Sequence, residues 1–551
     1  MKRKIIIGAS LGNCVHVAGV QHFLSQAEDC GWEVVFLGPA VSVDKIIAAV
    51  EKYRPDVVAI GYRLTPDNVV PLVLSLKERA GSLSHRPQWL FGGTRPVANA
   101  VSALGFFDTV YDGAEDLDDC IAYLKNTSRN VEQSPNESTI VSRIAQKSPY
   151  PLLRHHFGLP SFEDTLSGIR AIAQSRVLDV ISLGIDQNTQ QFFFHPEKRD
   201  SLMDGAGGVP VHNEAQFRML KEASQTGNFP LMRCYSGTAD VMRFADVLLN
   251  TIDNAWCATP LCWFNRLDGR GERTVSETMR QAQSLLKLHA KRSVPVEINE
   301  PHHWSLRDAH DTIAVAMAYI SAYNARACGL RDYVAQFMFN TPGALSFSMD
   351  LAKALAGIEL AQSLETPDFH IYRETRAGLP FLKNDLDLAK GQLAASTMLQ
   401  MAVRPQIIHV VGYSEAEHAA TSTVVIESAK IVRGVIRSVL DQSADPVCDP
   451  AVQNRKGELI SEARMLIDFI IDQYRDVSAD PLADPNVIAD CVRRGILAAP
   501  HILQSDLYRG VLKTRIIGGK CVAFDDGTGL QISESQRLET IALSTRKELI
   551  S

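Results

Sequence analysis

Short apolar segments alternate with amphipathic segments five times over the first 125 residues of the chain. The apolar segments predict strands at Lys4–Gly8, Glu33–Leu37, Asp56–Gly61, Gln88–Phe91 and Thr109–Tyr111. The amphipathic segments predict helices at Val17–Cys30, Val43–Lys52, Pro66–Arg79, Val97–Leu104 and Glu115–Lys125. Gly31 is a predicted C′ residue of the first helix, and Ser42 is a predicted N-cap of the second. This alternation is typical of a flavodoxin-like, doubly wound parallel sheet with helices on both faces, and it places residues 1–125 in the α/β class.

Sheets of this kind bind ligands outside the carboxyl ends of their strands. The loops Ala9–His16, Tyr62–Pro66 and Gly92–Pro96 follow three of the predicted strands. We therefore expect a ligand of this part of the chain to contact these three loops.

The rest of the chain divides by composition and pattern. Residues 126–149 are polar and predict a linker, and residues 441–551 predict an accessory region with a helix at Ser461–Tyr474 and a short hairpin. Between them, further strands are predicted at Val177–Gly184, Pro230–Arg233, Ala255–Thr259, Val294–Ile298, Val334–Phe339, His370–Tyr372 and Ile407–Val411. Helical patterns separate most of these strands, so residues 150–440 predict a (β/α)8 TIM barrel. A second open sheet remains an alternative, because periodicity does not show closure.

Composition excludes several classes of function. The net charge of −7 leaves no basic surplus for nucleic acid, and the ten cysteines contain no CxxC pair that would indicate a zinc or iron–sulfur site. The apolar run after the amino terminus is too short for a signal peptide or a membrane span. We expect a cytoplasmic homodimer that binds neither nucleic acid nor membrane.

The first of the three loops contains the most informative string, GASLGNCVHVAGV. His16 lies there at the ligand edge of the sheet, where an imidazole suits the lower axial ligand of a metal-bearing cofactor. The small residues Ala18 and Gly19 allow a bulky group to approach the backbone. The alternative is that His16 only caps a helix.

Three stretches in this region together resemble the cobalamin-binding domain of adenosylcobalamin-dependent mutases and methionine synthase. Cys14-Val15-His16-Val17-Ala18-Gly19 matches the family's DxHxxG string, Tyr62-Arg63-Leu64 matches SxL, and Gly92-Gly93 matches GG. The resemblance implies adenosylcobalamin as cofactor, with His16 as the cobalt ligand. It also implies cofactor contacts from Cys14, His16, Gly19, Tyr62, Leu64, Gly92 and Gly93.

Two positions depart from this family pattern. Cys14 stands where the family has the aspartate that orients the histidine. The neighbouring Asn13, one residue earlier, is an alternative acceptor for the hydrogen bond of His16. Tyr62 stands where the family has serine, and its bulk alters the pocket for the nucleotide tail of the cofactor.

The second part of the chain is similar to the catalytic subunit of glutamate mutase (methylaspartate mutase). Gly207–Asn213, Phe229–Asp240 and Val294–Pro301 carry the resemblance, with a weaker echo at Arg493–Pro500. The chain then resembles a fusion of the cobalamin domain with the catalytic barrel. The resemblance implies that Arg154 and Arg233 grip substrate carboxylates and that Glu415 lies on the cofactor side. The alternative for the two arginines is a structural ion pair with Asp186 or Asp240.

Other residues of the glutamate mutase site are missing. No arginine stands near Asn188–Gln191, no glutamate stands near Thr259, and Phe264 replaces a tyrosine. Glutamate is therefore not the expected substrate. In their place is the string NEPHHWSLR, where we expect an extended chain that presents His303 as a hydrogen-bond donor or general acid–base group. The alternative is a histidine pair that packs a loop.

These resemblances predict an adenosylcobalamin-dependent carbon-skeleton mutase, a radical isomerase, that acts on a small carboxylic acid. A corrinoid-dependent methyl transfer protein is one alternative. A cobalamin-binding protein with degenerate mutase activity is the other.

Overall fold

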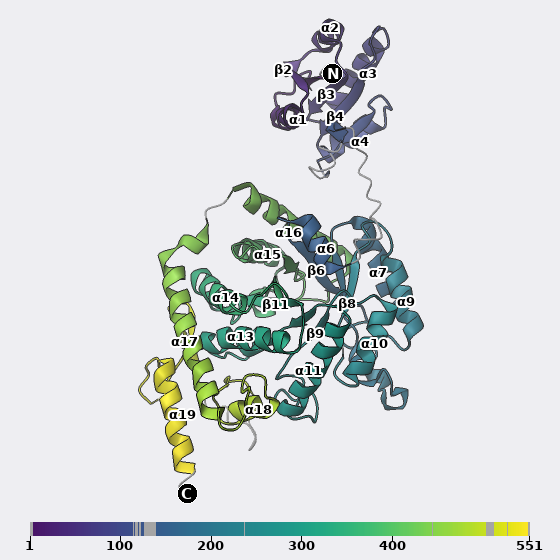
Figure 1. Ribbon diagram of the computed structural model, residues 1–551. Coiled ribbons are helices and arrows are strands. Elements are labelled where there is room, and N and C mark those ends of the chain that lie inside the picture. The colour runs from purple at the N-terminus through teal and green to yellow at the C-terminus, as the bar shows by residue number, and fades with distance from the viewer. Residues whose placement is uncertain are drawn as a thin grey trace. The chain divides into compact units, whose positions relative to one another are not determined.

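The computed structural model describes residues 4–113, 115, 120, 123–125, 139–235, 237–442, 445–502, 512–525 and 527–548. The chain forms two compact units, Met1–Glu132 and Gln133–Ser551, and each is described by itself (Figure 1). Most of the predicted helix Glu115–Lys125 lies outside the described residues.

The first unit contains one five-stranded sheet, whose strands are all parallel. The strands are β1 (Ile5–Leu11), β2 (Glu33–Val41), β3 (Val57–Tyr62), β4 (Gln88–Gly93) and β5 (Thr109–Tyr111). Their order is β2-β1-β3-β4-β5, which is the flavodoxin-like order and confirms the predicted fold class. The order reverses between β1 and β3, so the loops that follow these two strands flank the crevice where such sheets bind ligands.

Helices cover both faces of this sheet. The helices are α1 (Ala18–Asp29), α2 (Val43–Tyr53), α3 (Pro66–Ala80) and α4 (Arg95–Ser102). Val20 and Leu24 of α1 belong to one apolar cluster, while α2, α3 and α4 contribute to a second cluster with residues such as Val50 and Val73. Ser42 caps α2 by accepting a hydrogen bond from the Lys45 N–H at 3.5 Å, as predicted.

Strand β1 is longer than the sequence predicts. It continues past Gly8 to Leu11, because Ser10 pairs with Gly61 of β3 and Leu11 pairs with Val41 of β2. The loop therefore begins at Gly12, whose φ of 65° lies in the left-handed region that favours glycine.

The second unit contains eight parallel strands in a nearly closed barrel. They are β6 (Leu152–Phe157), β7 (Val180–Leu183), β8 (Leu231–Cys234), β9 (Cys257–Thr259), β10 (Val296–Ile298), β11 (Asp332–Phe339), β12 (His370–Ala377) and β13 (Ile407–His409). Strand β13 pairs with β6, so the last strand returns to the first. Between β8 and β9 no ladder forms, but the Ala255 N–H donates to Met232 O at 2.9 Å. This arrangement is consistent with the predicted TIM barrel, because the bond between Ala255 and Met232 joins the two edge strands β8 and β9.

Helices surround these strands (Figure 1). The long ones are α7 (Phe162–Ser175), α9 (Glu214–Ser224), α10 (Val241–Thr251), α11 (Val275–Lys291), α13 (Asp311–Ala327), α14 (Phe347–Gln362), α15 (Leu386–Met401) and α16 (Ser422–Gln442). Two short helices, α8 (Gln187–Phe192) and α12 (Glu300–Ser305), follow β7 and β10 at the carboxyl ends of these strands.

Part of the predicted linker 126–149 is helical instead. Helix α6 (Ile140–Lys147) begins after Thr139, whose side chain accepts a hydrogen bond from the Ser142 N–H at 3.2 Å. Ile140 is buried against Leu152 and Trp256 of the barrel. The polar composition hid this helix, because only a few of its residues face the barrel.

The carboxyl-terminal region shares the core of the barrel. Helix α17 (Pro450–Tyr474) begins earlier than the predicted Ser461 and packs along α13 and α14, with Leu459 and Leu466 fully buried. It is followed by α18 (Pro485–Arg493), the hairpin of β14 (Thr514–Ile517) and β15 (Lys520–Ala523), and α19 (Glu534–Glu548). The hairpin confirms its prediction.

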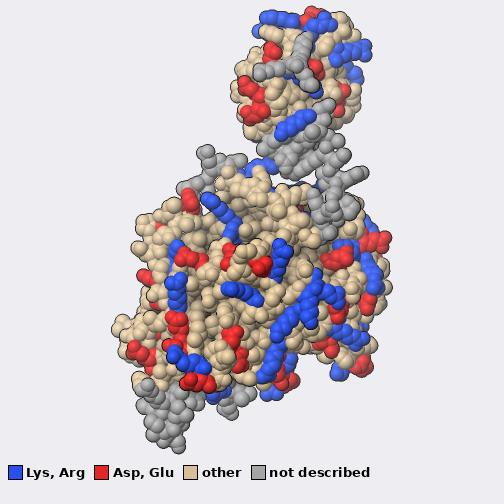
Figure 2. Space-filling model, viewed as in Figure 1, with Lys and Arg blue, Asp and Glu red and all other residues tan. Residues whose placement is uncertain are grey.

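Acidic and basic side chains are interspersed over the face of the second unit that Figure 2 shows. Ion pairs between exposed side chains of this unit include Arg292 with Asp246 at 3.1 Å. Among the described helices, none has both the length and the apolar character that crossing a membrane requires.

Candidate functional site

His16 lies in the loop between β1 and α1, at the crevice of the first unit. Its side chain is exposed, while its backbone is fixed from below by Ser10, whose buried hydroxyl donates to His16 O at 2.7 Å. Ser10 is a site residue that sequence reasoning missed, because the predicted strand ended before it. The loop thus presents a free imidazole on an anchored backbone.

Cys14 lies directly beneath the imidazole. Its buried Sγ is 3.8 Å from His16 Nδ1 and accepts a hydrogen bond from the Arg63 N–H at 3.3 Å. With the proton on Nδ1 facing this sulfur, Nε2 keeps the lone pair that a metal needs. Cys14 therefore occupies the orienting position that the family gives to aspartate, with a weaker acceptor.

Asn13 is not the partner of His16. Its Oδ1 accepts a hydrogen bond from the Tyr62 hydroxyl at 3.1 Å, which ties the loop after β1 to the end of β3. Tyr62 is only 1% exposed, and burial raises the pKa of its hydroxyl, with a further contribution from Cys14. The two departures from the family pattern thus hold the two loops together.

The predicted glycines differ in their surroundings. A Cβ on Gly19 or Gly92 would meet nothing within 4 Å, whereas a Cβ on Gly93 would lie 2.8 Å from Tyr62 O. Gly19 and Gly92 therefore leave open space that a ligand can fill, and Gly93 serves the packing of β4. Leu64 is 37% exposed in the loop after β3.

These observations fit a cobalamin. The exposed imidazole, with its Nδ1 directed to a partner, would offer one nitrogen to the cobalt, and the open space at Gly19 and Gly92 would leave room for a large flat group. His16, Cys14 and the two glycines are the residues that would hold it.

In the second unit, a layer of charged side chains fills the interior of the barrel. Arg154 of β6 donates from Nε to Glu374 of β12 at 2.8 Å, and its Nη2 also contacts Glu374 and, at 3.5 Å, Glu297 of β10. Gln336 of β11 donates from Nε2 to both glutamates at 2.9 Å. Burial raises the pKa of Glu374, the charge of Arg154 opposes this rise, and Glu297 adds to it.

Arg233 of β8 belongs to the same layer. Its Nη2 pairs with Glu297 Oε2 at 2.5 Å, and its guanidinium lies 5.1 Å from the ring centroid of Trp256. Burial disfavours the charged form of Arg233, but Glu297, Tyr235 and Glu374 together outweigh it and raise the pKa of Arg233. Its Nε and Nη1 have no hydrogen-bond partner among the described residues.

The expected alternative ion pairs with Asp186 and Asp240 are wrong. Asp186 caps α8 by accepting from the Thr189 N–H at 2.8 Å, and Asp240 lies 3.1 Å from His195. The glutamates that do pair with the arginines stand on β10 and β12, whose side chains alternate inward. In the sequence, Glu297 and Glu374 were recognisable only as acidic residues at strand positions that face inward.

Above this charged layer, aromatic and imidazole side chains line the carboxyl ends of the strands. His156 stacks on Tyr235 with a centroid distance of 5.7 Å and lies 4.8 Å from the ring of His409. Its Nε2 is 3.2 Å from Arg154 Nη1, and because arginine only donates, His156 is neutral and carries its proton on Nδ1. Burial and the charges of Arg154 and Arg233 lower the pKa of His156 well below its usual range.

Arg376 is the residue at these strand ends that sequence reasoning missed. It follows Glu374 by two positions on β12 and pairs in register with His409, so it faces the same interior one layer higher. The string RETR could have indicated Arg376, because an arginine two residues after an inward-facing glutamate faces the same side of the strand. Glu415 is exposed in the loop after β13. Burial raises its pKa, and the charge of Arg376 opposes this rise.

His303 lies on helix α12, not on the expected extended chain. Asn299 and Pro301 open this short helix directly after β10, so His302 and His303 share one turn with ring centroids 4.5 Å apart. Both ring nitrogens of His303 lack a hydrogen-bond partner among the described residues. Burial and the neighbouring His302 lower its pKa, so His303 is neutral, with one ring nitrogen that can donate a hydrogen bond and one that can accept.

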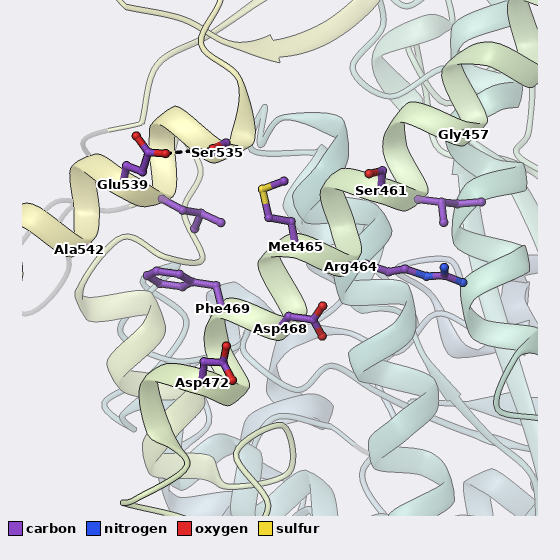
Figure 3. Close-up of a pocket in the computed structure, with 12 residues that line it drawn as sticks. Gly457, Ser461, Arg464, Met465, Asp468, Phe469, Asp472, Ser535, Glu539 and Ala542 are labelled. Carbon is purple, nitrogen blue, oxygen red and sulfur yellow. Dashed lines mark hydrogen bonds between the residues drawn. The ribbon is translucent and has the colours of Figure 1, made fainter.

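A separate pocket of about 760 Å³ lies between α17 and α19 (Figure 3). Exposed Arg464, Asp468 and Asp472 stand beside Met465 and Phe469 along its α17 wall. It contains none of the predicted site residues.

Comparison with known proteins bears on the first unit. Residues 4–119 match the B12 binding domain family. The matched range covers the whole β1–β5 sheet and both loops that hold His16 and Tyr62. Cobalamin binding by the first unit is thereby supported, whereas the form of the cofactor is not distinguished. No curated protein matches the chain.

Two solved structures are similar to parts of the chain. A cobalamin-binding protein from Desulfitobacterium hafniense DCB-2 is 25% identical, with a TM-score of 0.18 and coverage of 20% of this chain and 53% of that protein. The cobalamin-dependent S-adenosylmethionine radical enzyme OxsB, with aqua-cobalamin bound, is 11% identical, with a TM-score of 0.19 and coverage of 79% of this chain and 56% of that protein. The chain thus spans about half the length of each.

Proposed function

We propose that this protein is an adenosylcobalamin-dependent carbon-skeleton mutase whose substrate is a small carboxylic acid. The observation that carries the proposal is that one chain joins a B12 binding domain to a barrel whose interior holds buried arginines. A cofactor domain and a substrate domain are the two parts that a radical isomerase needs.

The barrel supports an anionic substrate. Arg154, Arg233 and Arg376 face its interior against two carboxylates, Glu297 and Glu374, and the histidines nearby are neutral. A buried positive charge without its own counterion favours an anion from outside. Arg233, with Nε and Nη1 unpartnered, is a proposed substrate contact, and Arg154 holds the layer in place.

The residues of this chain have separable tasks in the proposed reaction. Bound adenosylcobalamin supplies a carbon-centred radical through its weak cobalt–carbon bond. His16 orients the cofactor, the arginines hold the substrate carboxylate, and the stacked His156 and Tyr235 exclude water beside it. His303, neutral and buried, can donate or accept a hydrogen bond beside the substrate.

The proposal is tested by reconstituting the full chain with adenosylcobalamin and adding a panel of small mono- and dicarboxylic acids. We expect a cob(II)alamin signal in electron paramagnetic resonance when the correct acid is added, together with an isomerised product. Demethylation of methylcobalamin by an acceptor, without any radical signal, would instead indicate methyl transfer. Absence of cofactor uptake would overturn the proposal.

A further inference from the structure

Arg376 stands apart from the other two interior arginines in its bonding. Its Nε donates to its own neighbour Ala377 O at 3.2 Å, and no carboxylate among the described residues forms an ion pair with it. Arg154, by contrast, uses all three nitrogens on protein acceptors. The two Nη groups of Arg376 are thus free to bind an external acceptor.

The groups around Arg376 do not neutralise it. Its charge contributes to lowering the pKa of five histidines, namely His155, His156, His302, His303 and His409. These imidazoles are neutral at physiological pH and supply no negative charge. Glu374 and Glu297 favour the charge of Arg376 but form their ion pairs with Arg154 and Arg233. Glu415 is exposed and makes no ion pair with Arg376 in the described part of the chain.

The position of Arg376 suits a substrate. It is half-buried near the end of β12, two residues beyond Glu374, and pairs in register with His409 of β13. Residues at the carboxyl ends of barrel strands are the ones that contact substrates in (β/α)8 enzymes. Burial disfavours its charge and lowers its pKa, which an incoming anion would reverse.

We propose that Arg376 is the residue that binds the substrate carboxylate directly, through a bidentate contact of its two Nη groups. The inference rests on the proposed function for the identity of the substrate as an acid. It leaves Arg154 in a supporting layer whose charge is met by Glu374, keeps Arg233 as a second contact beside its Glu297 pair, and makes Arg376 the residue that selects for a carboxylate. An uncharged amide or ester of the same acid would lack this contact.

The test measures binding without turnover. Titration calorimetry of the full chain with the acid panel and with the matching amides gives affinities for the wild type, Arg376→Met, Arg376→Lys and a control, Arg373→Met. Arg373 is on the same strand, faces the opposite side, and donates to Arg404 O at 2.8 Å. We expect Arg376→Met to bind the acid about 10–100-fold more weakly, with Arg376→Lys intermediate, since a charge-assisted bidentate contact is lost. We expect the amide affinities to change little.

Equal affinity of the wild type and Arg376→Met for every acid, with both folded by circular dichroism, would overturn the inference. Failure of the wild type to bind any acid would overturn it as well. These outcomes are independent of the radical assay: a radical signal with unchanged acid binding in Arg376→Met leaves the mutase proposal standing, while lost acid binding without any radical signal leaves the carboxylate site standing.

Discussion

The Nδ1 atom of His16 lies 3.8 Å from the Sγ atom of Cys14, in the loop that joins the first strand to the first helix. The same sulfur accepts the Arg63 N–H, so the thiol connects the imidazole to the loop after β3. A cysteine thus does at this position what a carboxylate does in the family that the loop resembles, and the consequences are measurable.

Replacing Cys14 by alanine removes the partner of Nδ1 while the imidazole remains. We expect cobalamin affinity to fall about tenfold, the lower end of the effect of losing such an orienting partner. Visible absorbance titration of the apoprotein measures this, with Cys30→Ala as the matched control because Cys30 lies at the far end of α1. Unchanged affinity in Cys14→Ala would show that the sulfur does not orient His16.

Gly92 and Gly93 are adjacent but have different roles. Gly92→Val projects into open space, so we expect normal thermal stability and weakened cofactor binding. Gly93→Ala places a Cβ 2.8 Å from Tyr62 O, so we expect a lower melting temperature of the apoprotein. Differential scanning calorimetry with the cobalamin titration separates the two. A stable Gly93→Ala protein would contradict the packing role.

The buried pair of Arg154 and Glu374 predicts strong coupling in unfolding. Arg154→Met leaves Glu374 without its main counterion, which typically costs about 3–5 kcal/mol in the free energy of unfolding. We expect the double variant Arg154→Met/Glu374→Gln to regain part of this loss in urea denaturation. A single variant within 1 kcal/mol of the wild type, on the scale of a surface pair, would contradict the interpretation.

The buried His155 makes stability depend on pH. Burial, with the charges of Arg154 and Arg376, lowers its pKa to about 4, against 6.5 in an unfolded chain. The unfolded chain therefore binds the proton first as pH falls, and stability is lost between these values. We expect His155 to contribute a loss of about 2 kcal/mol from pH 7 to pH 5.

The contribution of His155 is isolated by comparison with His155→Gln, which does not titrate. Urea denaturation of both proteins at the two pH values gives the difference between their pH dependences. Equal pH dependence in the two proteins would mean that His155 is not buried in its neutral form.

Much of this architecture follows from local pattern. The alternation of apolar and amphipathic segments predicted the five strands of the first unit and seven of the eight in the second. The pattern does not predict strand β6, with the sequence LLRHHF, because three polar residues interrupt its apolar run. Arg154 and His156 point into the barrel, where partners on distant strands contact them, and His155 between them faces the opposite side.

The sites divide in the same way. The loop of His16 was predictable because its residues are close in sequence, whereas the pairing of Arg154 with Glu374 spans 220 residues and depends on β6 and β12 flanking β13. The expected extended NEPHHWSLR segment became helix α12, since Pro301 suits the first turn of a helix. The contact between Arg154 and Glu374 forms only when the strands assemble into the barrel.

The ligation of cobalt by His16 is the claim on which the account depends most, and it has a direct measurement. The full chain labelled with [15N]histidine and loaded with unlabelled cobalamin is reduced to cob(II)alamin, and its electron paramagnetic resonance spectrum is recorded. We expect a two-line nitrogen splitting on each cobalt line, which disappears in His16→Ala and persists in His22→Ala, a variant of an exposed histidine on α1. A three-line splitting in the labelled wild type, from the cofactor's own base, would contradict the account.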